Sequence, residues 1–479
     1  MKIHYRVALS IVLGTVTAAS GPTRSLSAQS PTAPVLTLRD ALERAEVDGY
    51  SNRIADGMAD AERGKVTGAL RGILPSLRME GGFVRTNDPI GAFGTTLRQR
   101  TITQADFDPD RLNRPPAIGN YQGAAVIEQP LFNADAWMGR RAASSGLEAS
   151  RSNARWAHIS TRVDVIRAYY GATLAREKTA TLEAAARAAH AHVRQAEAMV
   201  RQGLATRSDA LLASVGAGEV DAQLADADAE ARTAIRQLAV ALGQGRDFMP
   251  VLPESLPDAG RIRAVVGSAT AGADAVARTE REEAGRADVE AARHGLDAAR
   301  LDALRARSLY LPRLNSFARY DWNSANRLYA GMPSWTVGVM ASWSPFAGAS
   351  EMAERQAAAG RADAARAMAD AADESASLEA EQTRNELQAA LARLDIAERS
   401  VQQSAEAHRI VTRKYEGGLA TVVELLDAAA VETQSALRYS AARYAVITAG
   451  AQRLKALGRD PAILARLDDA SASIDNSSR

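Results

Sequence analysis

The spacing of proline divides this chain into two long stretches that are suited to long helices. No proline occurs between Leu131 and Met249, or between Phe346 and Asp460. Both stretches are rich in alanine, leucine, arginine, glutamate and glutamine, which favour helices, whereas proline ends or kinks them. The first helix is predicted over about 134–201, which is on the order of 100 Å long. A helix longer than a compact domain indicates a coiled coil or a barrel of helices.

The tetrapeptide GLAT interrupts each stretch once, at 203–206 and at 418–421. Glycine can end one helix and threonine can cap the next one. Asp209 and Glu424 each lie three residues after the threonine, which is the spacing of a capping box. Each GLAT is therefore predicted at the tip of a long antiparallel helical hairpin. The helix after the first tip carries apolar residues at coiled-coil spacing: Leu224, Ala227, Ala231, Ile235, Leu238 and Leu242.

The two turns belong to a longer repeat. Gly203 and Gly418 are 215 residues apart, and the tripeptide Ala-Leu-Gly at 241–243 recurs at 456–458 with the same offset. We interpret this pattern as an internal duplication in which the first copy has one longer loop. The predicted units are a signal peptide at 1–28, a first repeat at 29–243 with a β-hairpin at 75–130, an equatorial linker at 244–275, a second repeat at 276–458 with a β-hairpin at 312–345, and a polar tail at 459–479.

Within each copy, one region has apolar residues at every second position, which is the period of a strand, and not at helical spacing. Trp335, Val337 and Val339 alternate with polar or small residues, and Leu77 and Met79 follow the same pattern. Four strands in two hairpins are predicted. Of the 23 aromatic residues, 14 lie in 83–137 and 310–346, which is typical of the aromatic girdles of a membrane barrel. The alternative is a soluble sheet with one buried face.

Four strands cannot close a barrel, and the open edges of a sheet cannot face lipid. If these strands enter a bilayer, several chains must contribute to one barrel. The pattern therefore implies an oligomer on the membrane interpretation.

The N-terminus has the order of a secretory signal peptide. Lys2 and Arg6 precede an apolar stretch at 7–19, and small residues follow it. The alternative is a buried apolar helix. The sequence has no cysteine and, after this segment, no run of about 18 apolar residues, so an exported chain is expected to be soluble or to meet the membrane through strands. Cleavage is compatible with three positions, after Ser20, Ser27 or Ala28.

The composition gives no support to catalysis or nucleic-acid binding. The 58 basic and 57 acidic residues leave a formal charge of +1, so no nucleic-acid partner is expected. His190 and His192 point to different sides of a helix, which argues against a shared metal. No nucleotide-binding, hydrolase or metalloprotease fingerprint occurs. We expect no enzyme activity, no cofactor and no metal site.

Several ordered motifs carry a resemblance to a known family. They are LTLRDALERA at 36–45, GILPSL at 72–77, YQGAAVIEQPLF at 121–132, VDVIRAYYGATLARE at 163–177, both GLAT turns and the terminal ALG. In this order the chain resembles the TolC-like outer-membrane efflux proteins, the channels of tripartite efflux or type I secretion systems.

The resemblance implies a mixed α/β membrane protein, a homotrimer in which each chain gives four strands to a 12-stranded transmembrane β-barrel. Long helical hairpins would form a periplasmic α-barrel with an equatorial belt from 29–40, 245–275 and the segment after Gly458. The implied function is an exit duct in the outer membrane of a Gram-negative bacterium. The duct would contact the lipid of that membrane and extend into the periplasm. The implied partners are a periplasmic adaptor and an inner-membrane transporter, and the cargo is not identified. The alternatives are a periplasmic adaptor or a structural coiled-coil protein without a pore.

The resemblance also assigns roles to the two tips. It implies that Gly203, Leu204, Gly418 and Leu419 contact the adaptor. An exposed leucine at a glycine turn suits partner binding. The alternative is that both tips are only turns that reverse a helix.

The helices that follow the tips carry further matches. Glu424 and Asp427 match an acidic ring at the periplasmic entrance of the pore, where three copies would favour cations. Their alternative role is to complement a helix dipole. Tyr415 and Asp209 match a pair that helps hold the family's closed state, and Ala420 replaces the arginine of a second such contact.

Overall fold

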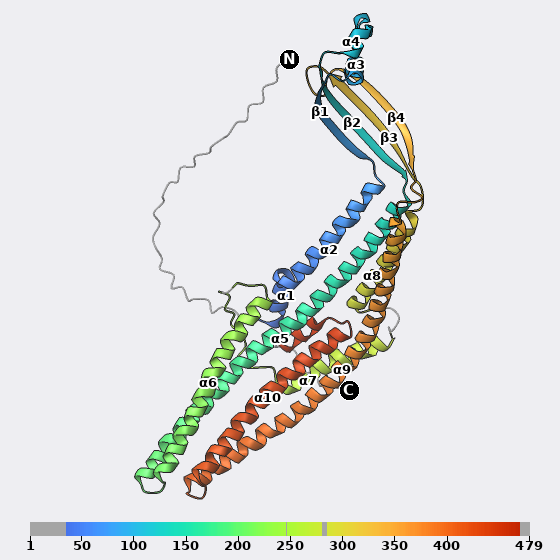
Figure 1. Ribbon diagram of the computed structural model, residues 1–479. Coiled ribbons are helices and arrows are strands. Elements are labelled where there is room, and N and C mark those ends of the chain that lie inside the picture. Colours follow the sequence, from blue (N-terminus) through green and yellow to red (C-terminus); the bar gives the residue numbers. More distant parts are fainter. Residues whose placement is uncertain (1–34, 246, 280–284, 470–479) are drawn as a thin grey trace, which may run out of the picture.

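The computed structural model describes residues 35–245, 247–279 and 285–469. It is an elongated molecule with a β-sheet at one end and two helical tips at the other (Figure 1). The predicted signal peptide at 1–28 and the last residues of the predicted tail, from 470 onward, lie outside the described residues.

Two antiparallel helical hairpins form about half of the described residues and lie side by side in Figure 1. The first consists of α5 (Ala134–Arg201) and α6 (Arg207–Ala241), and the second of α9 (Ser350–Glu416) and α10 (Val422–Ala456). The predicted helix at 134–201 is confirmed, because it is α5. The coiled-coil spacing after the first tip is also confirmed: Ala227, Leu238 and Leu242 are fully buried.

Shorter helices extend or brace the hairpins. Helix α2 (Tyr50–Gly68) packs along α5, and α8 (Ala287–Ser308) packs between α5 and α9 toward the sheet. None of the described helices is long and apolar enough to cross a membrane. The remaining elements of the chain are α1 (Leu38–Asp48), α2 (Tyr50–Gly68), η1 (Ala69–Gly72), α3 (Pro89–Arg98), η2 (Gln104–Phe107), α4 (Pro109–Asn113), α7 (Ala259–Thr279), α8 (Ala287–Ser308) and η3 (Pro461–Leu467).

The four predicted strands are present and form one antiparallel sheet. They are β1 (Ser76–Thr86), β2 (Ile118–Phe132), β3 (Arg313–Ser324) and β4 (Met332–Ser342), in the order β1-β2-β3-β4. Strands β2 and β3 pair with each other, which joins the β-hairpin of the first half of the chain to the β-hairpin of the second half. Within the described residues, β1 and β4 are edge strands with one neighbour each.

The register gives the sheet one apolar face. Leu77 pairs with Ile127, Ile127 with Ala318, and Ala318 with Val337, so these side chains point to the same side. An apolar face that is open to solvent requires a partner. Its large exposed side chains are Leu77, Met79, Phe83, Ile127, Tyr320, Trp335, Val337 and Val339.

The opposite face of the sheet is polar. Arg319 forms ion pairs with Glu80 and Asp321 across and along the strands. Phe317, which breaks the alternating pattern of the sequence, also lies on this face and pairs with Gly338. Its ring occupies the space that a side chain at position 338 would need, because a Cβ there would lie 3.0 Å from ring atoms. Phe317 therefore covers a glycine and leaves the apolar face unbroken.

The main core lies at mid-length, where segments distant in sequence meet. Tyr169 and Tyr170 of α5 are fully buried, and their hydroxyl groups donate to Asp468 at 2.8 and 2.9 Å. The same carboxylate accepts the backbone N–H of Leu38 at 2.7 Å. Burial, and then the charge of Asp468, raises the pKa of Tyr169, which keeps its hydroxyl protonated as a donor.

The segment after Gly458 takes part in this core. Leu464 and Leu467 of η3 are buried, so the first part of the region predicted as a polar tail packs against α1, α5 and α7. Leu36 donates its backbone N–H to the carbonyl of Val251 at 2.8 Å, which connects two further segments around the same core.

A second buried cluster ties the two hairpins together. Glu177 of α5 accepts from the guanidinium of Arg443 of α10 and from the hydroxyl of Ser440. It also accepts the backbone N–H of Leu256 at 2.8 Å, and Arg443 donates to the carbonyl of Leu256 at 3.0 Å. Both charged side chains are largely buried, so their charges depend on this network.

Candidate functional site at the helical tips

The two GLAT turns have the same backbone geometry. Gly203 and Gly418 have φ values of 75° and 72°, in the left-handed region that favours glycine. Leu204 donates its N–H to Met199 at 2.9 Å, and Leu419 donates to Lys414 at 2.8 Å. These are the bonds of a Schellman motif, which closes the preceding helix. Among the described residues, no atom lies within 4 Å of a Cβ added at either glycine, so the conformation alone demands glycine there.

Both predicted capping boxes are confirmed. The hydroxyl of Thr206 accepts the N–H of Asp209 at 3.3 Å, and the carboxylate of Asp209 accepts the N–H of Thr206 at 2.8 Å. Thr421 and Glu424 repeat the arrangement at 3.2 and 2.7 Å. At each tip, the capping box therefore satisfies two of the backbone N–H donors that the start of a helix leaves free.

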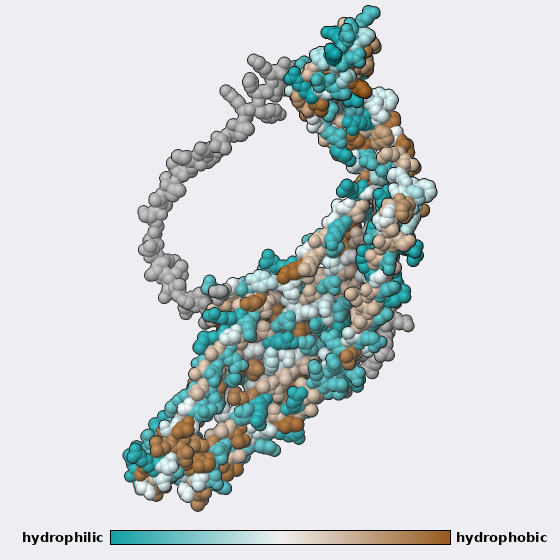
Figure 2. Space-filling model, in the orientation of Figure 1, coloured by the Kyte–Doolittle hydropathy of each residue, from teal (hydrophilic) through white to brown (hydrophobic). Residues whose placement is uncertain are grey.

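The leucine of each turn projects into solvent. Leu204 is 69% exposed and Leu419 is 82% exposed. Figure 2 shows hydrophobic side chains gathered at the tip of the first hairpin. Leu211, Leu212 and Val215 of α6 are exposed apolar residues close to this tip. Exposed apolar residues on capped turns are a surface suited to a partner.

A small apolar cluster connects the tips of the two hairpins. It consists of Ala196, Ala213, Tyr415, Val422 and Leu425, contributed by α5, α6, α9 and α10. Ala420 packs against this cluster. Ala420, the position at which the resemblance implies an arginine, is thus part of an apolar contact in this chain.

The structure brings Tyr415 and Asp209 near each other without a hydrogen bond. Burial, and then the charge of Asp209, raises the pKa of Tyr415. The Tyr415 hydroxyl is buried and has no hydrogen-bond partner among the described residues. Asp209 instead uses its carboxylate for the capping box with Thr206. The two residues thus lie near each other on different hairpins, and no hydrogen bond joins them.

The two acidic residues after the second tip differ in their surroundings. The carboxylate of Glu424 accepts from the backbone and hydroxyl of Thr421, and these bonds, with the charge of Lys414, lower the pKa of Glu424. Asp427 is exposed and lines a cavity between the hairpins. The lowered pKa keeps Glu424 ionised near the tip, which is the property that an acidic ring requires.

Sequence reasoning missed this cavity, which has a volume of about 570 Å³. Alanines from α5 and α10 form much of its wall, and His192 of α5 and His408 of α9 lie there with ring centres 5.8 Å apart. His408 is hydrogen-bonded to Glu432. In the sequence, the histidine nearest to His192 is His190. In the structure, the histidine beside it is His408, which lies on the other hairpin. No local spacing could reveal that pair.

Acidification is expected to loosen the contact between the hairpins at His192. Burial, followed by the charge of His408, lowers the pKa of His192 from 6.5. When the hairpins are separated, His192 binds a proton below pH 6.5, whereas the packed hairpins disfavour its protonated form. The contact between the hairpins therefore loses stability as the pH drops below 6.5, and its stability does not change above that pH. Once the exchange rates are divided by the intrinsic rate at each pH, hydrogen exchange at the tips should therefore accelerate from about pH 7.5 to about pH 5.5.

His192→Gln should remove most of this acceleration. His294→Gln on α8 serves as the control and should retain it. Equal pH dependence in both variants would contradict the assignment of the effect to His192.

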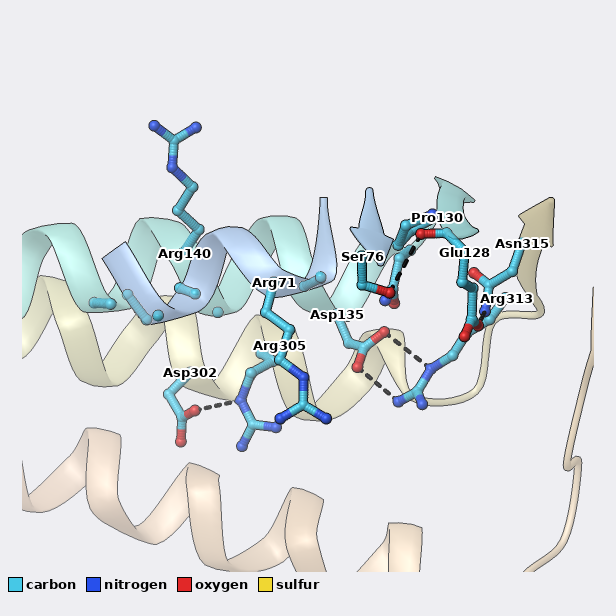
Figure 3. Close-up of a pocket in the computed structure, with 18 of the residues that line it drawn as sticks. Arg71, Ser76, Glu128, Pro130, Asp135, Arg140, Asp302, Arg305, Arg313 and Asn315 are labelled. Atoms are coloured by element: carbon cyan, nitrogen blue, oxygen red, sulfur yellow. Dashed lines mark hydrogen bonds and ion pairs between the residues drawn. The ribbon is translucent and has the colours of Figure 1, made fainter. Parts of the chain in front are cut away.

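A larger cavity, of about 1130 Å³, lies where the sheet meets the helices. Figure 3 shows two ion pairs among its charged side chains: Arg313 with Asp135 of α5 at 2.7 Å, and Arg305 with Asp302 at 2.6 Å. Arg140 points away from these pairs (Figure 3). The first pair joins β3 to α5, and Arg305 also forms an ion pair with Glu354, which joins α8 to α9. Within the described parts of the chain, no group of three or more histidine, cysteine or acidic residues could hold a metal ion.

Comparison with known structures places the fold among outer-membrane channels. The outer membrane protein VceC from Vibrio cholerae matches with a TM-score of 0.69 at 19% identity, covering 88% of this chain and 96% of that one. The CmeC channel of Campylobacter jejuni matches with 0.71 at 14% identity, covering 93% and 94%. The open-state MtrE channel of Neisseria gonorrhoeae matches with 0.67 at 19% identity, covering 88% and 89%.

The sequence comparison reaches the same family. No curated protein sequence matches the chain significantly. The family model described as outer membrane efflux protein matches residues 60–244 and 279–459, which is most of the chain and includes both tips. The chain therefore belongs to the outer membrane efflux protein family, whose members are exit ducts that lie in the outer membrane and extend into the periplasm.

Proposed function

We propose that three copies of this chain close one 12-stranded transmembrane barrel and continue it as a helical duct through the periplasm. One observation carries this proposal: a four-stranded sheet with one exposed apolar face, one polar face and two open edges. The apolar face suits lipid and the polar face suits a water-filled lumen. Because β1 and β4 run antiparallel, β1 of one copy can pair with β4 of the next.

The two halves of the chain support an internal duplication. Helices α5 and α9 have 68 and 67 residues, and α6 and α10 have 35 each. We keep the repeats at 29–243 and 276–458 as the proposed units, with 244–275 as the linker between them. The contacts of Leu36, Val251 and Asp468 around the central core support an equatorial belt built from three separate segments.

The tips are the proposed docking surface for a periplasmic adaptor, through Gly203, Leu204, Gly418 and Leu419. Their twice-repeated backbone geometry and exposed leucines support this role. An inner-membrane transporter would supply the energy, and no catalytic role is proposed for the chain itself. A periplasmic adaptor or a pore-free coiled-coil protein is not favoured, since the family match spans both halves of the chain.

Glu424 and Asp427 are the proposed acidic ring at the entrance of the duct, and Tyr415 and Asp209 are proposed to approach one another in its closed state. The position of both pairs next to the tip cluster supports these roles. In a threefold assembly, each acidic position would occur three times around the pore, which favours cations.

Conductance in planar bilayers tests the duct and its entrance together. Purified protein should form channels with cation preference, and Glu424→Lys/Asp427→Lys should shift that preference toward anions. Glu374→Lys/Glu381→Lys makes the same charge change on exposed positions of α9 away from the tip. If the purified protein forms no channels, the proposed duct is wrong. If the Glu424→Lys/Asp427→Lys variant forms channels with unchanged selectivity, only the proposed acidic ring is wrong.

A further inference from the structure

Helix α3 is built into the loop between β1 and β2 and is held firmly in place. Its first turn is capped by Asp88, whose carboxylate accepts the N–H of Gly91 at 2.6 Å. Its end is fixed by Arg100, which has a positive φ of 55° and donates through its guanidinium to the carbonyl of Pro333 at the start of β4. The helix therefore has a defined position relative to the strands.

One face of α3 rests on the polar side of the sheet. Gln99, just after the helix, donates to the side-chain oxygen of Asn120 at 3.0 Å, and Asn120 donates to Asn323 at 2.8 Å. All three side chains are buried, and so are Ala92 and Thr95 on the same face of α3. Such a satisfied polar network fixes geometry.

The strand register identifies which side of the sheet this is. On β2, Asn120 lies two positions before Gln122 and pairs with Val84 of β1. On β3, Asn323 lies two positions after Asp321. Side chains two positions apart along a strand point to the same side. Helix α3 thus sits on the face that carries Arg319 and Asp321, at the end of the strands that is distant from the helical hairpins.

The opposite side of α3 carries exposed apolar side chains beside Phe93, which packs edge-on against Phe107 of η2. Ile90 and Leu97 lie seven positions apart and therefore on one side of the helix, about 180° from Ala92 and Gln99. Ile90 is 85% exposed and Leu97 is 47% exposed. Because the seated face contacts the sheet, these two side chains point away from it, toward the space that the polar face encloses.

We propose that the Ile90 and Leu97 faces of three copies meet near the threefold axis and form a hydrophobic constriction at the outer end of the duct. This inference rests on the proposed trimer, which is the source of the partner copies. Twelve strands about 4.8 Å apart and tilted by about 40° enclose a backbone circle about 24 Å across. Three helices, each about 10 Å wide with side chains, would fill most of it. A ring of apolar side chains at such a neck gates a channel by excluding water.

The natural absence of cysteine makes this arrangement directly testable. In a threefold assembly, the same residue of two copies can meet only near the axis. Ile90→Cys in the full-length trimer should therefore give a disulfide-linked dimer with an oxidant, seen on a non-reducing gel. Val337→Cys, which is 63% exposed on the opposite, apolar face of the sheet, should give none.

Channel recordings supply the second measurement. Ile90→Ser/Leu97→Ser should raise single-channel conductance at least about twofold over the parent, because polar side chains keep the neck hydrated. The constriction would be overturned if Ile90→Cys forms intact trimers without a disulfide, or if Ile90→Ser/Leu97→Ser does not change the conductance. Either result would leave the proposed duct standing. Absence of trimers in the Val337→Cys variant would overturn both.

Discussion

Arg443→Ala is expected to weaken the joint between the two hairpins by about 3–5 kcal/mol, the largest stability effect that this structure predicts. The variant leaves the carboxylate of Glu177 buried with its charge unpaired, although Ser440 and Leu256 still donate to it. It also frees the carbonyl of Leu256, which loses a donor. Hydrogen exchange of α5 and α10 amides in the detergent-solubilised protein measures the loss locally, where a single global unfolding step cannot be assumed.

Two further variants separate the buried charge from simple truncation. Glu177→Met/Arg443→Met removes both charges and should recover most of the loss. Arg409→Ala removes the exposed partner of Glu406 on α9 and should leave exchange unchanged. If the double variant is as unstable as Arg443→Ala, the account of an uncompensated charge is wrong.

Leu204→Asp/Leu419→Asp should abolish crosslinking to the adaptor and leave the trimer intact. Burying a leucine side chain at an interface contributes about 1.5–3 kcal/mol, so losing both should lower affinity at least about 100-fold. An aspartate would in addition carry a charge into the contact. The measurement is chemical crosslinking to the adaptor in cells, with trimer yield followed on gels.

Leu378→Asp is the matched control for the tip variant. Leu378 is 56% exposed on α9, away from the tip, and its replacement should not reduce crosslinking. Crosslinking that survives the double tip substitution would show that the tips are helix reversals without a docking role.

The sequence predicted the elements whose signals are local. Proline spacing and composition predicted α5 over 134–201, and the threonine–acid spacing predicted both capping boxes, because each depends on residues a few positions apart. The alternation of Trp335, Val337 and Val339 likewise predicted β4. Helix period, strand period and cap chemistry all act within one element, so a single sequence contains them.

Features formed by distant segments could not be predicted in this way. His192 and His408, or Glu177 and Arg443, come together only because two hairpins pack side by side. The seating of α3 on the sheet depends on Gln99, Asn120 and Asn323, which lie on three elements. The part played by Ala420 was equally hidden: the sequence showed a missing arginine, and the structure shows an apolar contact.

The closure of three copies through β1 and β4 is the central claim, and a paired-cysteine crosslink tests it most directly. Met79→Cys on β1 is combined in turn with Trp335→Cys, Val337→Cys or Val339→Cys on β4, because the stagger between copies sets which pair is level. Cross-strand neighbours lie about 4.5–5.5 Å apart, within disulfide reach. The account predicts a covalent trimer, and no larger species, for at least one pair. Monomers alone, or a ladder that continues beyond three chains, would contradict it.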